Sequence, residues 1–187
     1  MKAIQRCIMV IIAIVLIDSC TKKETTPPSA AETNGTLLAG AKGASKNWNL
    51  TSMLGSVNGS TPQDIQVLTS TSFPACELDN VFQFSNNSTQ SFQHSEGGSL
   101  CTSGDPTVVE SGSWALTNDG KTLLIDAIVN ATSTQVQSAA EPFLGYMILA
   151  WGAPLTVLQL TATSLKVSYT YVYNSDTYVI TLVFAKN

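Results

Sequence analysis

The sequence predicts an all-β domain, and three observations support this fold class. Short segments alternate apolar and polar residues with a period of two, which is typical of strands that bury one face. Clusters of Asn, Asp, Gly and Ser separate these segments, and these residues favour tight turns. Apolar residues with a helical period do not extend over any segment of convincing length.

The first residues are typical of an export signal. Lys2 and Arg6 give a basic start, and an apolar run follows from Cys7 to Ile17. This run is shorter than the roughly 20 apolar residues that span a bilayer, but it suits the core of a signal peptide.

The segment Ile17-Asp18-Ser19-Cys20 resembles the lipobox of bacterial lipoproteins, in which a small residue precedes a diacylated cysteine that becomes the new N-terminus. Several acyl chains anchor a protein firmly, whereas one chain binds only marginally. We therefore expect residues 1–19 to be a lipoprotein signal peptide and Cys20 to carry lipid. The protein would then be anchored in the bacterial cell envelope, at the periplasmic or surface face of the outer membrane. The alternative is an ordinary secretory signal that is cut elsewhere, with Cys20 merely retained.

Residues 20–45 are predicted to form a flexible, lipidated tether. From residue 21 the stretch is rich in Thr, Ser, Ala, Gly and Pro and shows no apolar periodicity. Such a segment cannot bury enough apolar surface to offset the entropy lost on ordering. The compact domain is expected to span residues 46–187, a length that fits one domain with a real core.

The charge of this domain excludes nucleic acid as a partner. From Lys46 onward the chain has four lysines and ten acidic residues, a net charge of −6. The only arginine is Arg6, inside the predicted signal. Nucleic-acid binding depends on a basic surface, which this composition does not supply.

The first part of the domain contains predicted strands and a hairpin. Trp48–Leu50 opens the first strand, and Ile65–Leu68 is a candidate for the second. Val81–Phe84 alternates clearly, turns at Asn86-Asn87 and returns through Phe92. The turn fits because Asn tolerates the left-handed backbone that tight turns require.

Two cysteines, Cys76 and Cys101, lie in the predicted domain. In an exported protein such a pair indicates a disulfide, which would stabilise the fold by roughly 3 kcal/mol. Both cysteines fall beyond the open ends of the hairpin just described, where a disulfide would clamp the two strands. The alternative, a metal site, lacks partners because the only histidine is His94. No metal or cofactor is therefore expected.

A second hairpin and a strongly apolar segment follow. Trp114–Leu116 turns at Asn118-Asp119-Gly120 and returns through Leu123–Ile125. Residues 141–152 are the most apolar stretch outside the signal. We interpret this stretch as a buried strand or short helix that plugs the core, and a lid or portal beside a cavity is the alternative.

The closing hairpin has the clearest pattern. A turn centred on Ser175-Asp176 would pair Tyr173 with Tyr178 and Tyr171 with Ile180. Because a strand with one buried face fixes its register, we expect the bulky face to point into the interior and the other face toward water. The bulky face carries Val167, Tyr169, Tyr171, Tyr173, Tyr178, Ile180, Leu182 and Phe184. The other face of the first strand carries Lys166, Ser168 and Thr170.

These residues resemble the lipocalin-like domains found on bacterial lipoproteins. The resemblance implies an antiparallel up-and-down barrel of about eight strands, which can hold one small ligand in its interior. It covers roughly residues 47–186 and rests on the following motifs, in chain order: Trp48-Asn49-Leu50-Thr51-Ser52, residues 76–84, Cys101, Gly112-Ser113-Trp114, residues 118–123, Leu160-Thr161 and the closing hairpin.

The sequence does not indicate an enzyme, and no catalytic residue is expected. The chain has one histidine and no nucleophile elbow, phosphate-binding loop or cluster of metal ligands. Glu77 and Asp79 are spaced to share a strand face, but solvated charges at a strand end explain them better. Glu110, Asp119 and Asp126 are interpreted as charges of loops or strand edges.

Two functions remain. In the first, the barrel binds a small apolar or amphipathic molecule, or a sugar stacked on tyrosine rings. Its candidate contacts are aromatic: Phe82, Phe84, Trp114, Tyr169, Tyr171 and Tyr173. In the second, the same residues are only the core of a structural or protein-interaction lipoprotein. A filled interior would favour the second function, and a cavity of about 300 Å³ or more would favour the first.

Overall fold

The structure is a computed structural model. It describes residues 26–69, 75–100, 103–104, 106–130 and 154–187. The signal peptide predicted for residues 1–19, the lipidation of Cys20, the predicted disulfide partner Cys101 and the apolar segment 141–152 lie outside the described residues. These expectations therefore remain predictions.

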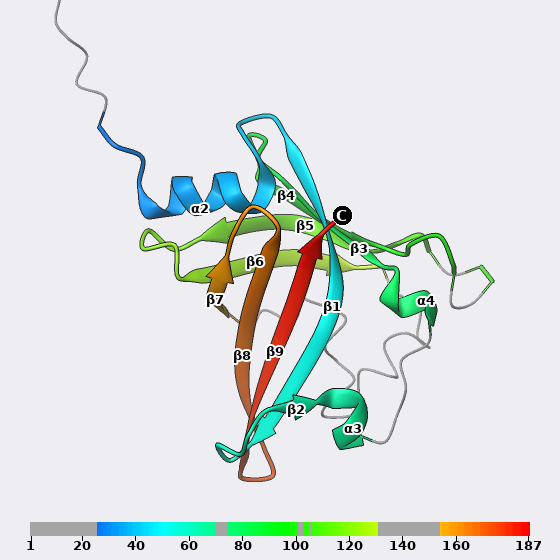
Figure 1. Cartoon of the computed structure of the whole chain (residues 1–187). Coiled ribbons are helices and arrows are strands. Elements are labelled where there is room, and N and C mark those ends of the chain that lie inside the picture. Colours follow the sequence, from blue (N-terminus) through cyan, green and yellow to red (C-terminus); the bar gives the residue numbers. More distant parts are fainter. Residues whose placement is uncertain (1–25, 70–74, 101–102, 105, 131–153) are drawn as a thin grey trace, which may run out of the picture.

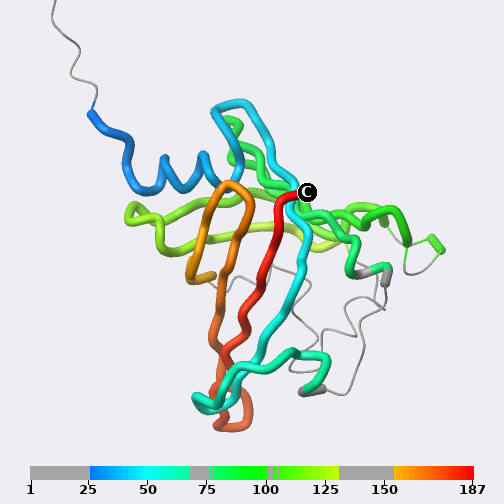
Figure 2. The backbone as a smooth tube through the Cα atoms, in the orientation of Figure 1, coloured from blue at the N-terminus to red at the C-terminus, as the bar shows by residue number. Residues whose placement is uncertain are grey.

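Within the described residues, eight antiparallel strands close into a barrel (Figure 1). Each strand pairs with the next, and the C-terminal strand returns to lie beside the first (Figure 2). The predicted all-β class and the barrel of about eight strands are therefore confirmed. The strands are β1 (Ser45–Val57), β3 (Val81–Ser85), β4 (Ser91–Ser95), β5 (Val108–Leu116), β6 (Thr122–Val129), β7 (Leu155–Leu160), β8 (Ser164–Tyr173) and β9 (Asp176–Lys186).

The long first strand changes the phase of its side chains at a bulge. The pairing of β1 with β9 shifts between Leu50 and Ser52. Before this point Trp48 and Leu50 are buried, and after it Met53 is buried. These positions do not share one period-two series, so the extra residue keeps the apolar side chains of both halves on the inner face.

A helix that the sequence analysis did not predict closes one end of the barrel. The helix α2 (Ala30–Ala39) begins with a capping box in which the Ser29 and Glu32 side chains satisfy each other's backbone N–H groups. Leu38 is fully buried, and its carbonyl accepts a hydrogen bond from Trp48 Nε1 at 2.9 Å. The expectation of a flexible tether through residue 45 is therefore wrong over this helix. Only a few of its side chains reach the core, so no apolar stripe marks it in the sequence.

Two short helices and a short strand lie between β1 and β3 in the chain. The helix α3 (Ile65–Thr69) and the two-residue strand β2 (Gln63–Asp64), which pairs with the second half of β1, lie near the end of the barrel opposite α2 (Figure 1). The helix α4 (Ala75–Leu78) lies beside the start of β3 (Figure 1). The strand predicted at Ile65–Leu68 is wrong because this segment is helical. Asp64 Oδ1 accepts a hydrogen bond from the backbone N–H of Gln66 at 2.8 Å, which favours a helical start.

The two earlier hairpins agree with the predictions. Strands β3 and β4 are joined through the turn that follows Ser85, and Gln90 adopts a positive φ of 49° there. Strands β5 and β6 pair from Leu116↔Leu123 onward, and Gly120 in their turn has a φ of 68°. At both turns the left-handed backbone reverses the chain between two strands.

The closing hairpin has the predicted faces but a different register. Its turn residues are Asn174 and Ser175, with φ of 49° and 73°. Tyr173 pairs with Asp176, and Tyr171 pairs with Tyr178. The predicted pairing was therefore wrong by two residues. A shift of two positions leaves every side chain on its expected face.

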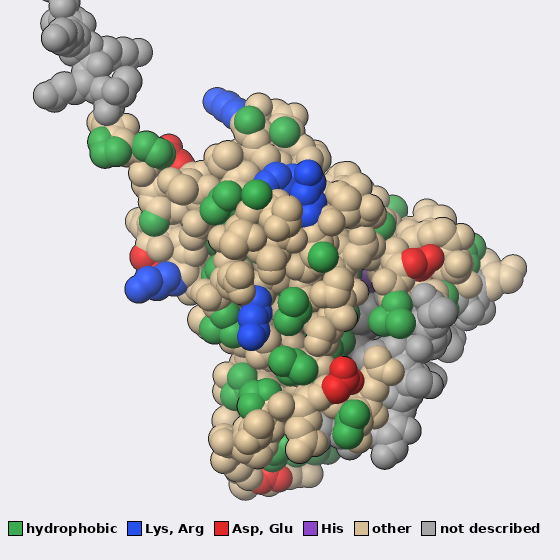
Figure 3. All heavy atoms as spheres, viewed as in Figure 1, with side chains coloured by type: hydrophobic (Ala, Val, Ile, Leu, Met, Phe, Trp, Pro, Cys, Tyr) green, Lys and Arg blue, Asp and Glu red, His purple; other side chains and the backbone are tan. Residues whose placement is uncertain are grey.

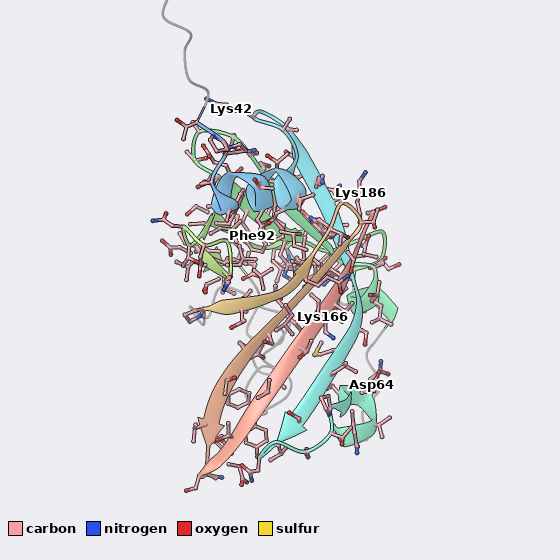
Figure 4. The ribbon with its side chains drawn as sticks, turned by 60° about the vertical axis from the view of Figure 1, so that its left-hand side comes forward. Lys42, Asp64, Phe92, Lys166 and Lys186 are labelled. Atoms are coloured by element: carbon pink, nitrogen blue, oxygen red, sulfur yellow. The ribbon has the colours of Figure 1, made fainter. Side chains whose placement is uncertain are left out.

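The core is aromatic and lies below α2. Phe92 lies within the cluster of side chains under this helix, whereas Asp64 lies at the far end of the molecule (Figure 4). Phe84 contacts Phe92 with ring centroids 5.1 Å apart and Trp114 with centroids 6.2 Å apart. Gly35 of α2 packs so closely on Trp114 that a Cβ there would lie 3.4 Å from the indole ring. The helix therefore seals this end by direct contact with the aromatic core.

Candidate ligand-binding site

The inner face of β8 changes from filled core to partly exposed surface along its length. Leu165 and Val167 are 1 % and 0 % exposed, Tyr169 and Tyr171 are half-buried, and Tyr173 is 50 % exposed. This strand runs away from α2 toward the β8–β9 turn (Figure 1). The barrel interior is therefore filled at the α2 end and becomes accessible toward the opposite end.

Three tyrosines form a stacked row on this inner wall. The rings of Tyr169 and Tyr171 have centroids 6.1 Å apart at an interplanar angle of 24°. The rings of Tyr171 and Tyr178 have centroids 5.0 Å apart at 11°. The predicted inward orientation of Tyr169 and Tyr171 is confirmed, because both pack against the buried core and Thr170 between them is exposed.

The hydroxyls of Tyr169 and Tyr171 remain protonated at neutral pH. Burial, with a smaller contribution from neighbouring Tyr178, raises the pKa of Tyr171 to about 12. Burial also raises the pKa of Tyr169, and the nearby Tyr171 adds to this effect. Each ring therefore combines an apolar face with a hydroxyl that can donate and accept a hydrogen bond.

The other predicted contacts lie in a different part of the barrel. Phe82, Phe84 and Trp114 are buried core residues on β3 and β5. Trp114 Nε1 donates to the Ser85 carbonyl at 3.1 Å, which fixes the indole in the closed half. The six predicted residues thus do not form one pocket. The phenylalanines and the tryptophan fill the interior, and the tyrosines line its more open end.

The sequence analysis missed a buried polar cluster on the inner wall. His94 of β4 and Glu110 of β5 are both fully buried, and His94 Nδ1 lies 3.2 Å from Glu110 Oε1. On the other side of the ring, Asn80 Nδ2 lies 3.2 Å from His94 Nε2. The ring of Phe82 stacks on His94 with centroids 4.1 Å apart. The interpretation of Glu110 as an edge charge is therefore wrong.

The amide nitrogen of Asn80 assigns the hydrogen bonds of this cluster. An amide nitrogen only donates, so Asn80 Nδ2 donates to His94 Nε2, and Nδ1–H of the same ring donates to Glu110 Oε1. The two-residue alternation of side chains along the strands could have revealed this cluster. His94 is two residues from Phe92, Asn80 is two from Phe82, and Glu110 is four from Trp114, so each polar residue shares a face with an aromatic core residue.

The hollows lined by described residues include two that lie away from the tyrosine row. One, of about 460 Å³, lies between α2 and the β3–β4 turn and includes Lys42, Asn87 and Gln90. The other, of about 40 Å³, lies beside the β1 bulge and includes Leu50 and Met53. None of the six predicted contacts lines either hollow.

Comparison with known proteins identifies the family. A family model for the lipocalin-like domain matches residues 45–139, from the start of β1 to beyond the end of β6. The chain belongs to the lipocalin-like domain family. No curated protein matches this lipocalin-like chain. The family resemblance inferred from the sequence is therefore confirmed.

The described part of this lipocalin-like protein offers neither a cluster of metal ligands nor a membrane-spanning helix. Its His, Cys, Asp and Glu side chains do not gather there in any group of three that could hold a metal ion. Within the same residues, every helix is too short or too polar to span a membrane.

Proposed function

We propose that this lipocalin-like protein binds a small apolar or amphipathic molecule in the open half of its barrel. The row of Tyr169, Tyr171 and Tyr178 carries this proposal, because these rings lie on the inner wall and are only half-buried. Core aromatics are normally covered completely when a barrel is filled by its own side chains. Partly exposed, stacked rings with hydroxyls offer both apolar contact and hydrogen bonding to a guest molecule.

A fluorescent probe tests the binding function. We expect the full chain in lipid nanodiscs to bind N-phenyl-1-naphthylamine saturably, after subtraction of the signal from empty nanodiscs. Tyr171→Ala should weaken this binding several-fold because it removes the central ring of the row. Tyr173→Ala is the matched control, since Tyr173 lies on the same strand and face but is half-exposed at the turn. Equal loss in both variants, or no saturable binding by the wild-type chain, would contradict the proposal.

We further propose that the protein is non-catalytic and is held in the bacterial cell envelope by lipid on Cys20. The lipobox-like segment ending at Cys20 supports the anchor. The disulfide predicted between Cys76 and Cys101 would fit export, because disulfides persist mainly outside the cytoplasm. With α2 beginning at Ala30, the stretch between the proposed anchor and the domain is shorter than the sequence suggested.

A filled barrel with a structural or protein-interaction role is the second candidate. The complete burial of Phe82 and Phe84 and the close packing of Trp114 support it for the half of the interior nearest α2. The tyrosine row favours ligand binding for the other half. The nanodisc experiment separates the two functions, because a filled barrel would not bind the probe saturably.

A further inference from the structure

One buried acceptor on the inner wall has no hydrogen-bond donor. Asn80 is 5 % exposed, and its Oδ1 has no partner within the described part of the chain. Its Nδ2 is engaged by His94, and its backbone carbonyl accepts from Asn49 Nδ2 at 2.9 Å. Buried polar atoms are almost always paired in folded proteins, so an unpaired oxygen here requires an explanation.

The neighbouring Asp79 Oδ1 is also unpaired but is differently placed. Gly97 packs directly on this carboxyl group, and a Cβ at Gly97 would lie 2.5 Å from Oδ1. The other oxygen of Asp79 accepts from the Ser99 N–H at 3.1 Å. Asp79 is therefore covered by the segment that follows β4, whereas Asn80 directly precedes β3 and is buried two residues before Phe82.

The position of Asn80 places its amide beyond the aromatic core as seen from α2. On β3, Phe84 contacts Trp114 below the helix and Phe82 comes next, and Asn80 directly precedes the strand, farther from the helix. Phe82 also contacts Phe184 of β9 edge-on, with centroids 5.1 Å apart. The polar cluster therefore lies on the side of the core that faces the half of the barrel lined by tyrosines.

The charges near this position favour a donor and disfavour an anion. Among the described residues, the buried side chains that can carry charge are His94, Glu96 and Glu110. Lysine side chains appear on the surface of the molecule (Figure 3), and Lys42, Lys121 and Lys186 are exposed. Lys46 is half-buried and donates to the Leu37 carbonyl of α2, and the half-buried Lys166 lies on the outward face of β8. A carboxylate or phosphate entering the interior would meet buried acidic groups without a lysine or arginine to pair with.

We infer that Asn80 Oδ1 accepts a hydrogen bond from the ligand, and that the ligand is an apolar molecule bearing a hydroxyl or amine donor. This inference rests on the proposed binding function and specifies its ligand class. The Asn80–His94–Glu110 cluster holds the amide so that Oδ1 is presented to the donor, and the apolar body lies in the barrel interior beyond it. A neutral or cationic ligand fits these groups, and an anionic one does not.

Three matched probes test the inference on the full chain in nanodiscs. They are 2-naphthol, which has a donor, 2-methoxynaphthalene, which has lost it, and 2-naphthoate, which is an anion at pH 7.5. Equilibrium dialysis against empty nanodiscs corrects for partition into lipid. We expect 2-naphthol to bind about tenfold more tightly than its methyl ether, the effect of one hydrogen bond, and 2-naphthoate to bind most weakly.

Variants on β3 locate the donor site. Asn80→Leu should reduce the preference for 2-naphthol over its ether to less than about twofold, because the acceptor is lost. Gln83→Leu is the matched control, since Gln83 lies three residues farther along the chain, on the outward face of β3, where it donates to Asn47. It should keep the full preference. Nuclear magnetic resonance of the ¹⁵N-asparagine-labelled wild-type chain gives an independent readout, because 2-naphthol should shift the Asn80 side-chain amide and the ether should not.

Each outcome decides between the two proposals. Equal wild-type binding of 2-naphthol and its ether would overturn the donor inference but leave ligand binding intact. A preference that survives in folded Asn80→Leu, or tighter binding of 2-naphthoate, would overturn it as well. If Asn80→Leu does not fold, an unshifted Asn80 amide in the wild-type spectrum overturns the inference and a selective shift supports it. If no probe binds saturably, both the inference and the proposed function fail.

Discussion

The role of α2 as the closed end of the barrel can be tested by removing one buried side chain. Leu38 is fully buried at the point where the helix meets Trp48. Leu38→Ala deletes the buried part of the side chain and leaves a cavity, which costs about 2–5 kcal/mol at fully buried sites. The substitution leaves the backbone carbonyl that accepts from Trp48 in place, so the loss should come from packing alone.

The neighbouring leucine provides the control. Leu37 is only partly buried, and its carbonyl, which accepts from Lys46 Nζ at 2.6 Å, is also unaffected by substitution. Leu37→Ala should cost about 1 kcal/mol or less because less apolar surface is lost. Urea unfolding of protein that lacks residues 1–20, monitored by tryptophan fluorescence, measures the free energy of unfolding of both variants. With a urea slope of about 2 kcal/mol/M, Leu38→Ala should lower the midpoint by about 1–2.5 M and Leu37→Ala by about 0.5 M. Equal small shifts would show that residues 30–39 are a tether after all.

Three further predictions concern the anchor, the disulfide and the tyrosines. Cys20→Ala should release the protein from the membrane fraction with its domain folded, and membrane retention of the variant after signal cleavage would refute the lipid anchor. Cys76 and Cys101 should appear as one linked peptide pair in mass mapping without reduction, and replacing both with Ala should cost about 3 kcal/mol of unfolding free energy. The raised pKa values favour the neutral phenols of Tyr169 and Tyr171 in the folded state. The stability from this effect is present below pH 10 and is lost as the pH rises through 12. Absorbance at 295 nm should therefore show that these phenols ionise only near the pH at which the protein unfolds.

Alternation of residue types was sufficient to predict most strands and their faces. On β3 the phenylalanines at 82 and 84 point inward, and on β8 the tyrosines at 169 and 171 do so, as the period-two pattern indicates. The same pattern could not set the register of the closing hairpin. A slip of two residues changes no face, so only the turn distinguishes the pairings. Asn174 and Ser175 can both adopt positive φ and form a two-residue turn, which selects the pairing found.

The elements that the sequence analysis missed depend on contacts between distant segments. The helix α2 shows no apolar stripe because a small surface around Leu38 is enough to close the barrel. Ile65 was assigned to a strand by its neighbours in sequence, but it is fully buried at the start of α3. The shift in pairing between β1 and β9 coincides with the change of phase that places Met53 on the inner face. In each case tertiary packing overrides the local preference.

The polar cluster shows how a strand pattern can point to a binding site. Where a strand alternates aromatic and polar residues, a polar side chain at an aromatic position must be buried, and it then needs partners from neighbouring strands. Asn80, His94 and Glu110 meet this condition, and the last two lie directly opposite each other on β4 and β5. Burying these polar side chains costs more free energy than burying an apolar residue unless all their polar atoms are hydrogen-bonded. Asn80 Oδ1 is unpaired within the described residues, so the free-energy cost of burying it is lowest when a ligand supplies the missing donor. This requirement links the buried polar groups to the proposed function.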